Sequence, residues 1–258
     1  MTSLIQLDWS MAIIVLAIML FAGLVHGTLG LGFPMVATPM LAIFFDVRTA
    51  ILITLLPTVA INIASIWNSR DSLGHLGRFS PLIFFVLPGS LVGAYILAIA
   101  DPAPFRLALA ALILLYLWTN ISGRLPRQWL VSNLMLAMVL FGFSAGFAAG
   151  TTNVMVAILI VFFLSLEVPR SSMVPVLNAC FLVGKVSQII VLSLAGLVGL
   201  SLFYETIPLA LAAIIALQFG QRIREKIAVD VYRRILHGLL VVLAIILIVQ
   251  FFGPGLAR

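Results

Sequence analysis

Two glycine- and polar-rich breaks inside long apolar runs decide the fold of this chain. The first half reads GLVHGTLGLGFPMVATPMLAIFFDVRTA over residues 23–50, and the second half reads GFSAGFAAGTTNVMVAILIVFFLSLEVPRSS over residues 142–172. The Gly-Leu-Gly-Phe-Pro run at 30–34 interrupts a helix, because glycine loosens the backbone and proline removes an N–H donor. The triplet Thr-Thr-Asn at 151–153 occupies the matching place in the second half. The sequence therefore predicts one interrupted helix near the start of each half.

The composition places the chain in a lipid bilayer. Of its 258 residues, 64% are hydrophobic and 9% are charged, and the mean hydropathy is +1.28. A soluble domain carries about 25% charged residues, so this chain has too little polar surface to coat a water-soluble particle. The net charge of +6 comes from basic residues in short breaks between apolar runs, not from a stripe along a polar face. Such placement is typical of membrane orientation signals and argues against a nucleic-acid partner.

No cofactor and no metal site are expected from the sequence. The single cysteine, Cys180, lies in an apolar run, so neither an intrachain disulfide nor a multi-cysteine metal site can form. The residues before the first apolar run, MTSLIQLDWSM, include no Lys or Arg, whereas a cleavable secretory signal begins with a basic region. We therefore expect the first apolar run to remain as a membrane helix.

Ten apolar segments are separated by polar or Pro/Gly breaks. A helix needs about 20 apolar residues to cross the hydrocarbon core, and the second and seventh segments are shorter than that. Tryptophan side chains, which settle at the headgroup level, fall at segment ends in all four cases, Trp9, Trp67, Trp118 and Trp129. The segments are 10–29, 33–45, 48–67, 80–100, 104–120, 128–149, 153–165, 171–195, 200–219 and 231–252.

The distribution of basic residues favours a crossing by every segment. Cytoplasmic loops collect Lys and Arg. With ten crossings, one side carries Arg70, Arg78, Arg124, Arg127, Arg170, Arg222, Arg224, Lys226, Arg233 and Arg234, and the other carries Arg48, Arg106 and Arg258. If the two short segments only re-enter the membrane, the split becomes eight basic residues against five. This pattern predicts ten crossing elements, with both termini outside the cytoplasm.

The two halves resemble each other in the order of their apolar runs, and we expect repeats at 1–125 and 126–258. Gly23 aligns with Gly142, and Gly27 aligns with Gly146. Five elements per repeat place the second repeat upside down relative to the first, as in many secondary transporters. The predicted fold is thus an all-α polytopic membrane protein with about ten helices or half-helices in two inverted repeats. Interrupted helices in such folds meet near the midplane and form the substrate site.

Several stretches together resemble the sulfite exporter TauE/SafE family, also called the toluene-sulfonate uptake permeases. They are GTLGLGFPMVATP (27–39), SRDSLGHLGRF (69–79) and QFGQRIREKIAVDVYRRILHGLLVVLAIIL (218–247). The resemblance implies a multi-pass bacterial inner-membrane protein that moves sulfur oxyanions or sulfonates. The glycine-rich family pattern appears here as Gly27, Gly30, Gly32, Phe33, Pro34 and Pro39, with departures at Phe33 and Pro34. In the second half, side chains of Thr151, Thr152 and Asn153 replace the glycine run as hydrogen-bond donors.

Charged side chains at bilayer depth are costly and are functional candidates by default. Lys185 lies in the middle of an apolar segment and shares a helix face with Asn178 and Gln188. We predict that it supplies positive charge to an anion; the alternative is a lysine satisfied by carbonyls or tilted toward an interface. The predicted substrate-binding residues are His26, Gly30, Gly32, Phe33, Pro34, Asn62, Thr151, Thr152, Asn153, Asn178, Lys185 and Gln188.

His26 and the polar stripe that includes Asn62 also have interpretations unrelated to substrate binding. Unperturbed histidine titrates near neutral pH, so His26 could couple a proton, or it could only hydrogen-bond between helices. The polar stripe of Thr54, Thr58, Asn62 and Ser65 either lines a path or joins helices.

The function that these features favour is secondary transport of a small anion. A doubly charged anion leaving an inside-negative cell gains about 4.6 kcal/mol per 100 mV, which favours export. The alternatives are an anion channel and, because residues 142–146 read G-x-S-x-G, an intramembrane serine hydrolase, although that motif gives a nucleophile only on a strand-to-helix turn. The expected partners are the anion and the bilayer, and a homo-oligomer is compatible with the sequence.

Overall fold

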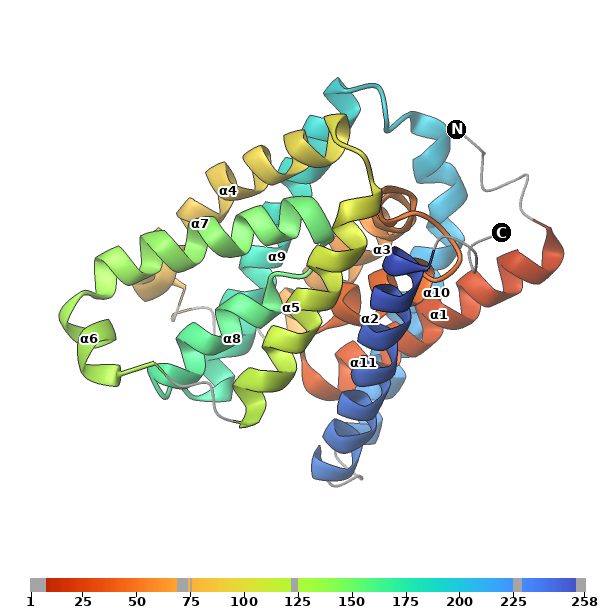
Figure 1. Cartoon of the computed structure of the whole chain (residues 1–258). Helices are drawn as coiled ribbons and strands as arrows, with labels where there is room; N and C mark the ends of the chain where they lie inside the picture. Colours follow the sequence, from red (N-terminus) through yellow and green to blue (C-terminus); the bar gives the residue numbers. More distant parts are fainter. Residues whose placement is uncertain (1–7, 69–73, 75, 122–124, 225–228, 254–258) are drawn as a thin grey trace.

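The computed structural model describes residues 8–68, 74, 76–121, 125–224 and 229–253, and within them every regular element is a helix (Figure 1). The basic residues Arg70, Arg124, Lys226 and Arg258 of the orientation argument lie outside the described residues. The elements are α1 (Trp9–Leu29), α2 (Phe33–Leu41), α3 (Val47–Asn68), η3 (Gly77–Phe79), α4 (Ser80–Ile99), α5 (Ala103–Ile121), α6 (Arg127–Ser132), α7 (Leu134–Thr152), α8 (Val156–Ser165), α9 (Arg170–Leu194), α10 (Leu200–Arg224) and α11 (Val229–Phe252).

Six segments are long and apolar enough to cross a membrane, namely α1, α3, η3 with α4, α7, α9 and α10. Shorter apolar stretches at Ala103–Thr119, Val156–Ser165 and Leu236–Phe252 add to them. The chain is a multi-pass membrane protein. Helices α2 and α8 have 9 and 10 residues, so at 1.5 Å per residue they reach about half of a ~30 Å hydrocarbon core. By length these two are half-helices, which agrees with the expected mixture of helices and half-helices; a crossing by every segment stays a prediction.

Other segment boundaries shift by a few residues. The predicted segment 128–149 is divided at Asn133, which ends α6 and begins α7. The predicted segment 33–45 ends as a regular helix at Leu41, after which the chain turns. All four tryptophans lie at or near helix ends with exposed side chains, from 44% for Trp129 to 85% for Trp9. Large apolar side chains also cover much of the outer surface, as expected where lipid is the solvent.

Both predicted interruptions are present, and each depends on a left-handed backbone. Gly30 ends α1 with a φ of 77°, and Gly32 precedes α2 with a φ of 101°. Asn153 ends α7 with a φ of 67°. Glycine adopts this region without steric cost and asparagine tolerates it better than most residues. The sequence at each break therefore stops one helix and restarts another at once.

Helix α1 packs closely against α10 from the other half of the chain. A Cβ atom added at Gly23 would lie 2.5 Å from the carbonyl oxygen of Ala213, and one at Gly27 would lie 2.2 Å from that of Leu217. Real Cβ atoms essentially never approach backbone oxygen so closely. The two glycines thus allow direct contact between the backbones of α1 and α10.

The same packing recurs between α4 and α7, which lie side by side (Figure 1). A Cβ atom at Gly142 would lie 2.5 Å from the carbonyl oxygen of Leu82, and one at Gly146 would lie 2.2 Å from that of Val86. The interrupted helices α1 and α7 therefore cross α10 and α4 of the opposite half through glycines at matching positions. This contact explains the small-residue spacing at residues 142–150 as helix packing.

Candidate functional site

Lys185 is buried in the middle of α9. Its side chain is 3% exposed, and its Nζ donates to Gln188 Oε1 at 2.5 Å. The two residues lie three positions apart, on one face of the helix. No carboxylate is among the residues that line the adjoining cavity. The lysine is therefore a buried amine whose hydrogen-bond partner within the described residues is a neutral amide.

Gln188 connects this lysine to the interruption of α7. Its Nε2 donates to the carbonyl oxygens of Ala149 at 3.2 Å and Gly150 at 2.9 Å. These carbonyls belong to the last turn of α7, where carbonyl groups lack partners further along the helix. The carbonyl of Ala149 also accepts the N–H of Asn153, the residue that ends α7. Gln188 thus donates from its amide nitrogen to the C-terminal end of α7 and accepts from Lys185 with its amide oxygen.

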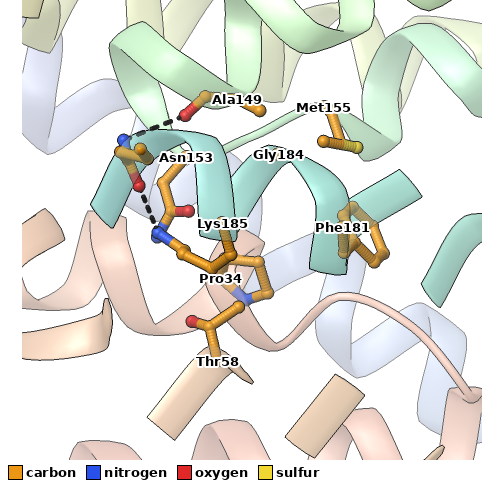
Figure 2. A pocket seen from close by; sticks show the side chains of 9 residues that line it. Pro34, Thr58, Ala149, Asn153, Met155, Phe181, Gly184 and Lys185 are labelled. Atoms are coloured by element: carbon orange, nitrogen blue, oxygen red, sulfur yellow. Dashed lines mark hydrogen bonds between the residues drawn. The ribbon is translucent and has the colours of Figure 1, made fainter. Parts of the chain in front are cut away.

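A small cavity lies beside Lys185 where the two halves meet, as Figure 2 shows. Its volume of about 10 Å³ is room for roughly one water molecule. Residues from α2, α3, α7, α9 and the α7–α8 break line it: Pro34, Thr58, Ala149, Asn153, Met155, Phe181, Gly184, Lys185 and Gln188. Pro34 follows the first interruption and Asn153 forms the second. Residues at both interruptions therefore line the same buried space.

The helix ends around this space favour a negative charge. Pro34 lies in the first turn of α2 and Met155 precedes α8. The N-terminus of α8 receives no side-chain cap, whereas the first N–H of α2, that of Phe33, donates to His26. Helix N-termini carry a partial positive charge and free N–H groups. The C-terminal carbonyls of the interrupted helices are covered, by Gln188 on α7 and by Arg170 on Thr28 and Leu29 of α1. The N-terminus of α8 thus remains uncapped beside the cavity, while the C-terminal carbonyls of α1 and α7 are hydrogen-bonded.

His26 lies at the α1 interruption and is fully buried. Its Nδ1 accepts the backbone N–H of Phe33 at 3.3 Å, so that Nε2 carries the proton and donates to Ser65 Oγ at 3.0 Å. Asn178 on α9 donates from Nδ2 to the carbonyl oxygen of Gly30 at 3.2 Å. These contacts match the alternative reading of His26 as a group that joins helices. They form a second polar cluster, outside the residues that line the cavity.

Asn153 ties the second interruption to the first half of the chain. Its Nδ2 donates to the hydroxyl oxygens of Thr38 on α2, at 2.8 Å, and Thr54 on α3, at 3.0 Å. Thr151 and Thr152 instead donate to carbonyls of their own helix. Their hydroxyl protons are thus engaged within α7 and do not reach the cavity.

Two polar side chains of α3 are buried without a hydrogen-bond partner in the described part of the chain. They are Thr58, a residue of the cavity lining whose Oγ1 is unsatisfied, and Asn62, one turn further on, whose Nδ2 and Oδ1 are both unsatisfied. Buried polar groups without a partner are uncommon and call for an explanation. A ligand or water that enters from the cavity would supply one.

The structure brings four of the predicted site residues to the cavity, Pro34, Asn153, Lys185 and Gln188. The other eight lie outside its lining, at the α1 interruption or on neighbouring turns: His26, Gly30, Gly32, Phe33, Asn62, Thr151, Thr152 and Asn178. The site prediction did not include Thr58, Ala149, Met155, Phe181 or Gly184. Thr58 belonged to the recognised polar stripe. Phe181 lies four residues before Lys185 and Gly184 four before Gln188, so helical spacing could have indicated them.

A family model for the sulfite exporter TauE/SafE matches residues 15–247, nearly the whole chain. The chain belongs to the sulfite exporter TauE/SafE family. No curated protein and no solved structure matches it. The match confirms the resemblance seen in the breaks, the loop and the final helices. Because sulfite exporters of the TauE/SafE family are membrane transporters, both interruptions and the buried lysine lie in a protein whose family moves anions.

The G-x-S-x-G run has a different role in this TauE/SafE family member. Ser144 lies in the middle of the continuous helix α7 and its side chain is exposed, while Gly142 and Gly146 pack against α4. A nucleophile of that motif needs a strained strand-to-helix turn. The run is therefore a helix-packing motif. Within the described residues, no three His, Cys, Asp or Glu side chains gather as metal ligands would.

Proposed function

We propose that this protein is a secondary transporter that exports a small sulfur oxyanion or sulfonate by alternating access, with Lys185 as the group that binds the anion. The observation that carries the proposal is the position of Lys185 Nζ in a buried cavity that both interruptions reach. An ammonium group beside the helix N-termini of α2 and α8, of which that of α8 is uncapped, offers positive charge and donors without a competing carboxylate. Asn153 and Thr58 would complete the polar wall of the site, and Pro34 would close it from α2.

The reciprocal packing of the halves supports an inverted repeat. The α1–α10 and α4–α7 crossings use glycines at matching positions and opposing carbonyls with the same spacing. In Figure 1, α1 and α7 run toward the middle of the molecule from opposite sides. Two related bundles that face each other across a central site are the architecture on which alternating access depends. The repeats would be 1–125 and 126–258.

The size of the cavity favours a carrier over a channel. About 10 Å³ is far too little for sulfite, which has four heavy atoms. An anion can therefore reach Lys185 only if the surrounding helices move. A channel would need a continuous path, whereas a closed site that opens to one side at a time fits a carrier.

The electrical gradient supports export without a coupled ion. A doubly charged anion that leaves an inside-negative cell gains about 4.6 kcal/mol per 100 mV, whereas uptake of the same ion needs a coupled cation. The cavity lining includes no carboxylate that would bind such a cation. Passive, potential-driven export is the simplest cycle that this site supports.

Anion flux from proteoliposomes at a clamped potential tests the proposal. Purified protein would first be screened by thermal shift against sulfite, sulfate, thiosulfate, small sulfonates and carboxylates. Lys185→Met should reduce the flux of each stabilising anion at least about tenfold, because the buried charge that attracts it is gone. The matched control is Ser187→Ala on the same helix, since its buried hydroxyl bonds only the carbonyl of Val183. Normal flux in Lys185→Met would rule out this site, and unsaturable flux far above about a thousand ions per second would indicate a channel.

A further inference from the structure

We infer that Gln188 takes the place of the anion when the site is unloaded, and that it thereby allows the carrier to change orientation without cargo. The inference rests on the proposed function, because it concerns how Lys185 is satisfied between transport events. It assigns to Gln188 a positioning role that acts through Lys185. Its consequence is that the protein performs net export and is not restricted to exchanging one anion for another.

The contacts of Gln188 fix the orientation of its amide. Carbonyl oxygens only accept hydrogen bonds and an ammonium only donates them. The amide nitrogen must therefore face Ala149 and Gly150, at 3.2 and 2.9 Å, and the amide oxygen must face Lys185 Nζ, at 2.5 Å. No other arrangement of this side chain satisfies all three neighbours. Gln188 is held by the end of α7 with an oxygen presented to the lysine, as an anion oxygen would be.

The anion and the Gln188 oxygen compete for one place. The cavity beside Lys185 holds about 10 Å³, so an anion has to displace a group already in contact with the ammonium (Figure 2). Within the described residues that group is Gln188 Oε1. When the anion leaves, the glutamine can return to the ammonium from its anchor on α7 without crossing the site.

A buried ammonium without a partner would hinder the return of the unloaded carrier. Helices can close around Lys185 easily only if its charge is hydrogen-bonded, because a buried charge without a partner is strongly unfavourable. The anion provides that partner in the loaded carrier, and Gln188 provides it in the unloaded carrier. Removal of Gln188 should therefore slow the unloaded return step far more than the loaded one.

The neutral amide is also the suitable chemical choice. A carboxylate at position 188 would form an ion pair with Lys185 and cancel the positive charge that attracts the anion. An apolar side chain would leave both Lys185 and the carbonyls of Ala149 and Gly150 without their present partner. Glutamine satisfies the ammonium while the net charge of the site remains positive.

The test compares net efflux with exchange of ³⁵S-sulfite in proteoliposomes. Net efflux into sulfite-free buffer requires the unloaded carrier to return. Exchange of labelled sulfite inside for unlabelled sulfite outside does not require that step. In Gln188→Met we expect net efflux to fall roughly tenfold or more and exchange to change by less than about threefold. Gln188→Glu should lose both activities, and the control Ser187→Ala should keep both. If the methionine variant is not monodisperse in detergent, Gln188→Asn replaces it, since its amide is one methylene too short to join Lys185 to α7.

The outcomes separate the inference from the function on which it rests. An equal loss of efflux and exchange in Gln188→Met, or no loss of either, would overturn the role of Gln188 while Lys185→Met still abolished flux. Wild-type protein that performs exchange but no net efflux would overturn it as well. The proposed function itself would be refuted by either of two other results. One is wild-type protein that transports neither sulfite nor any anion from the thermal-shift screen, and the other is a fully active Lys185→Met variant.

Discussion

Asn153 offers the most direct measurement of what holds the second interruption in place. Its backbone is left-handed, with a φ of 67°, and its amide donates to Thr38 and Thr54. A hydrogen bond between membrane helices contributes about 0.6 kcal/mol, up to about 1.7, so the two bonds contribute about 1–3 kcal/mol. Alanine in the left-handed region costs about 1–2 kcal/mol more than glycine. We therefore expect Asn153→Gly to lose about 1–3 kcal/mol of unfolding free energy and Asn153→Ala about 2–5 kcal/mol.

Unfolding by SDS in mixed micelles, followed by circular dichroism, would measure these free energies. Gly196 is the matched control, because its φ is 71° and an added Cβ would meet nothing within 4 Å. Gly196→Ala should therefore show the backbone cost alone, about 1–2 kcal/mol. Equal stability of Asn153→Ala and Asn153→Gly would refute the argument that the left-handed turn at the break restricts which residue can occupy it.

Two other contacts lead to predictions of the same kind. Gly27→Ala and Gly146→Ala should each destabilise the protein by about 1–3 kcal/mol and by similar amounts, because both place a Cβ atom 2.2 Å from a carbonyl oxygen. Gly238→Ala, where nothing lies within 4 Å, should cause little loss, and a large difference between the first two variants would contradict equivalent packing of the halves. Arg170→Met should lower the unfolding free energy by about 1–3 kcal/mol, because the carbonyl of Leu29 loses a charged donor; unchanged resistance to SDS would show that this contact does not fasten the end of α1.

The sequence was sufficient to locate the features that depend on local chemistry. Gly30 and Gly32 stop a helix through their own backbone freedom, and the structure places a break there. Lys185 stood out because it is charged inside an apolar run, and it is buried beside the cavity. Asn153 likewise ends α7 as the polar triplet suggested. Each of these predictions used only a residue and its immediate neighbours.

Features that depend on partners distant in the chain were beyond sequence reasoning. No pattern indicated that Gly146 packs on Val86, or that Gln188 donates to Gly150, since these contacts follow from how helices cross. The Thr151 hydroxyl was expected to serve a ligand but bonds its own helix, as Ser and Thr hydroxyls in helices often do. Segment length, in contrast, already indicated that α2 and α8 are too short for a full-length membrane helix.

Helices α3 and α9 each hold both interruptions at once. On α3, Ser65 contacts His26 of α1 and Thr54 contacts Asn153 at the end of α7. On α9, Asn178 bonds Gly30 and Gln188 bonds the last turn of α7, ten residues or about 15 Å further along the helix. A sliding or rolling motion of either helix must therefore disturb the two breaks simultaneously. The two breaks are thus coupled through α3 and α9. Opening the site to both sides of the membrane at once, which would let ions leak through, would require both of these helices to lose their contacts together.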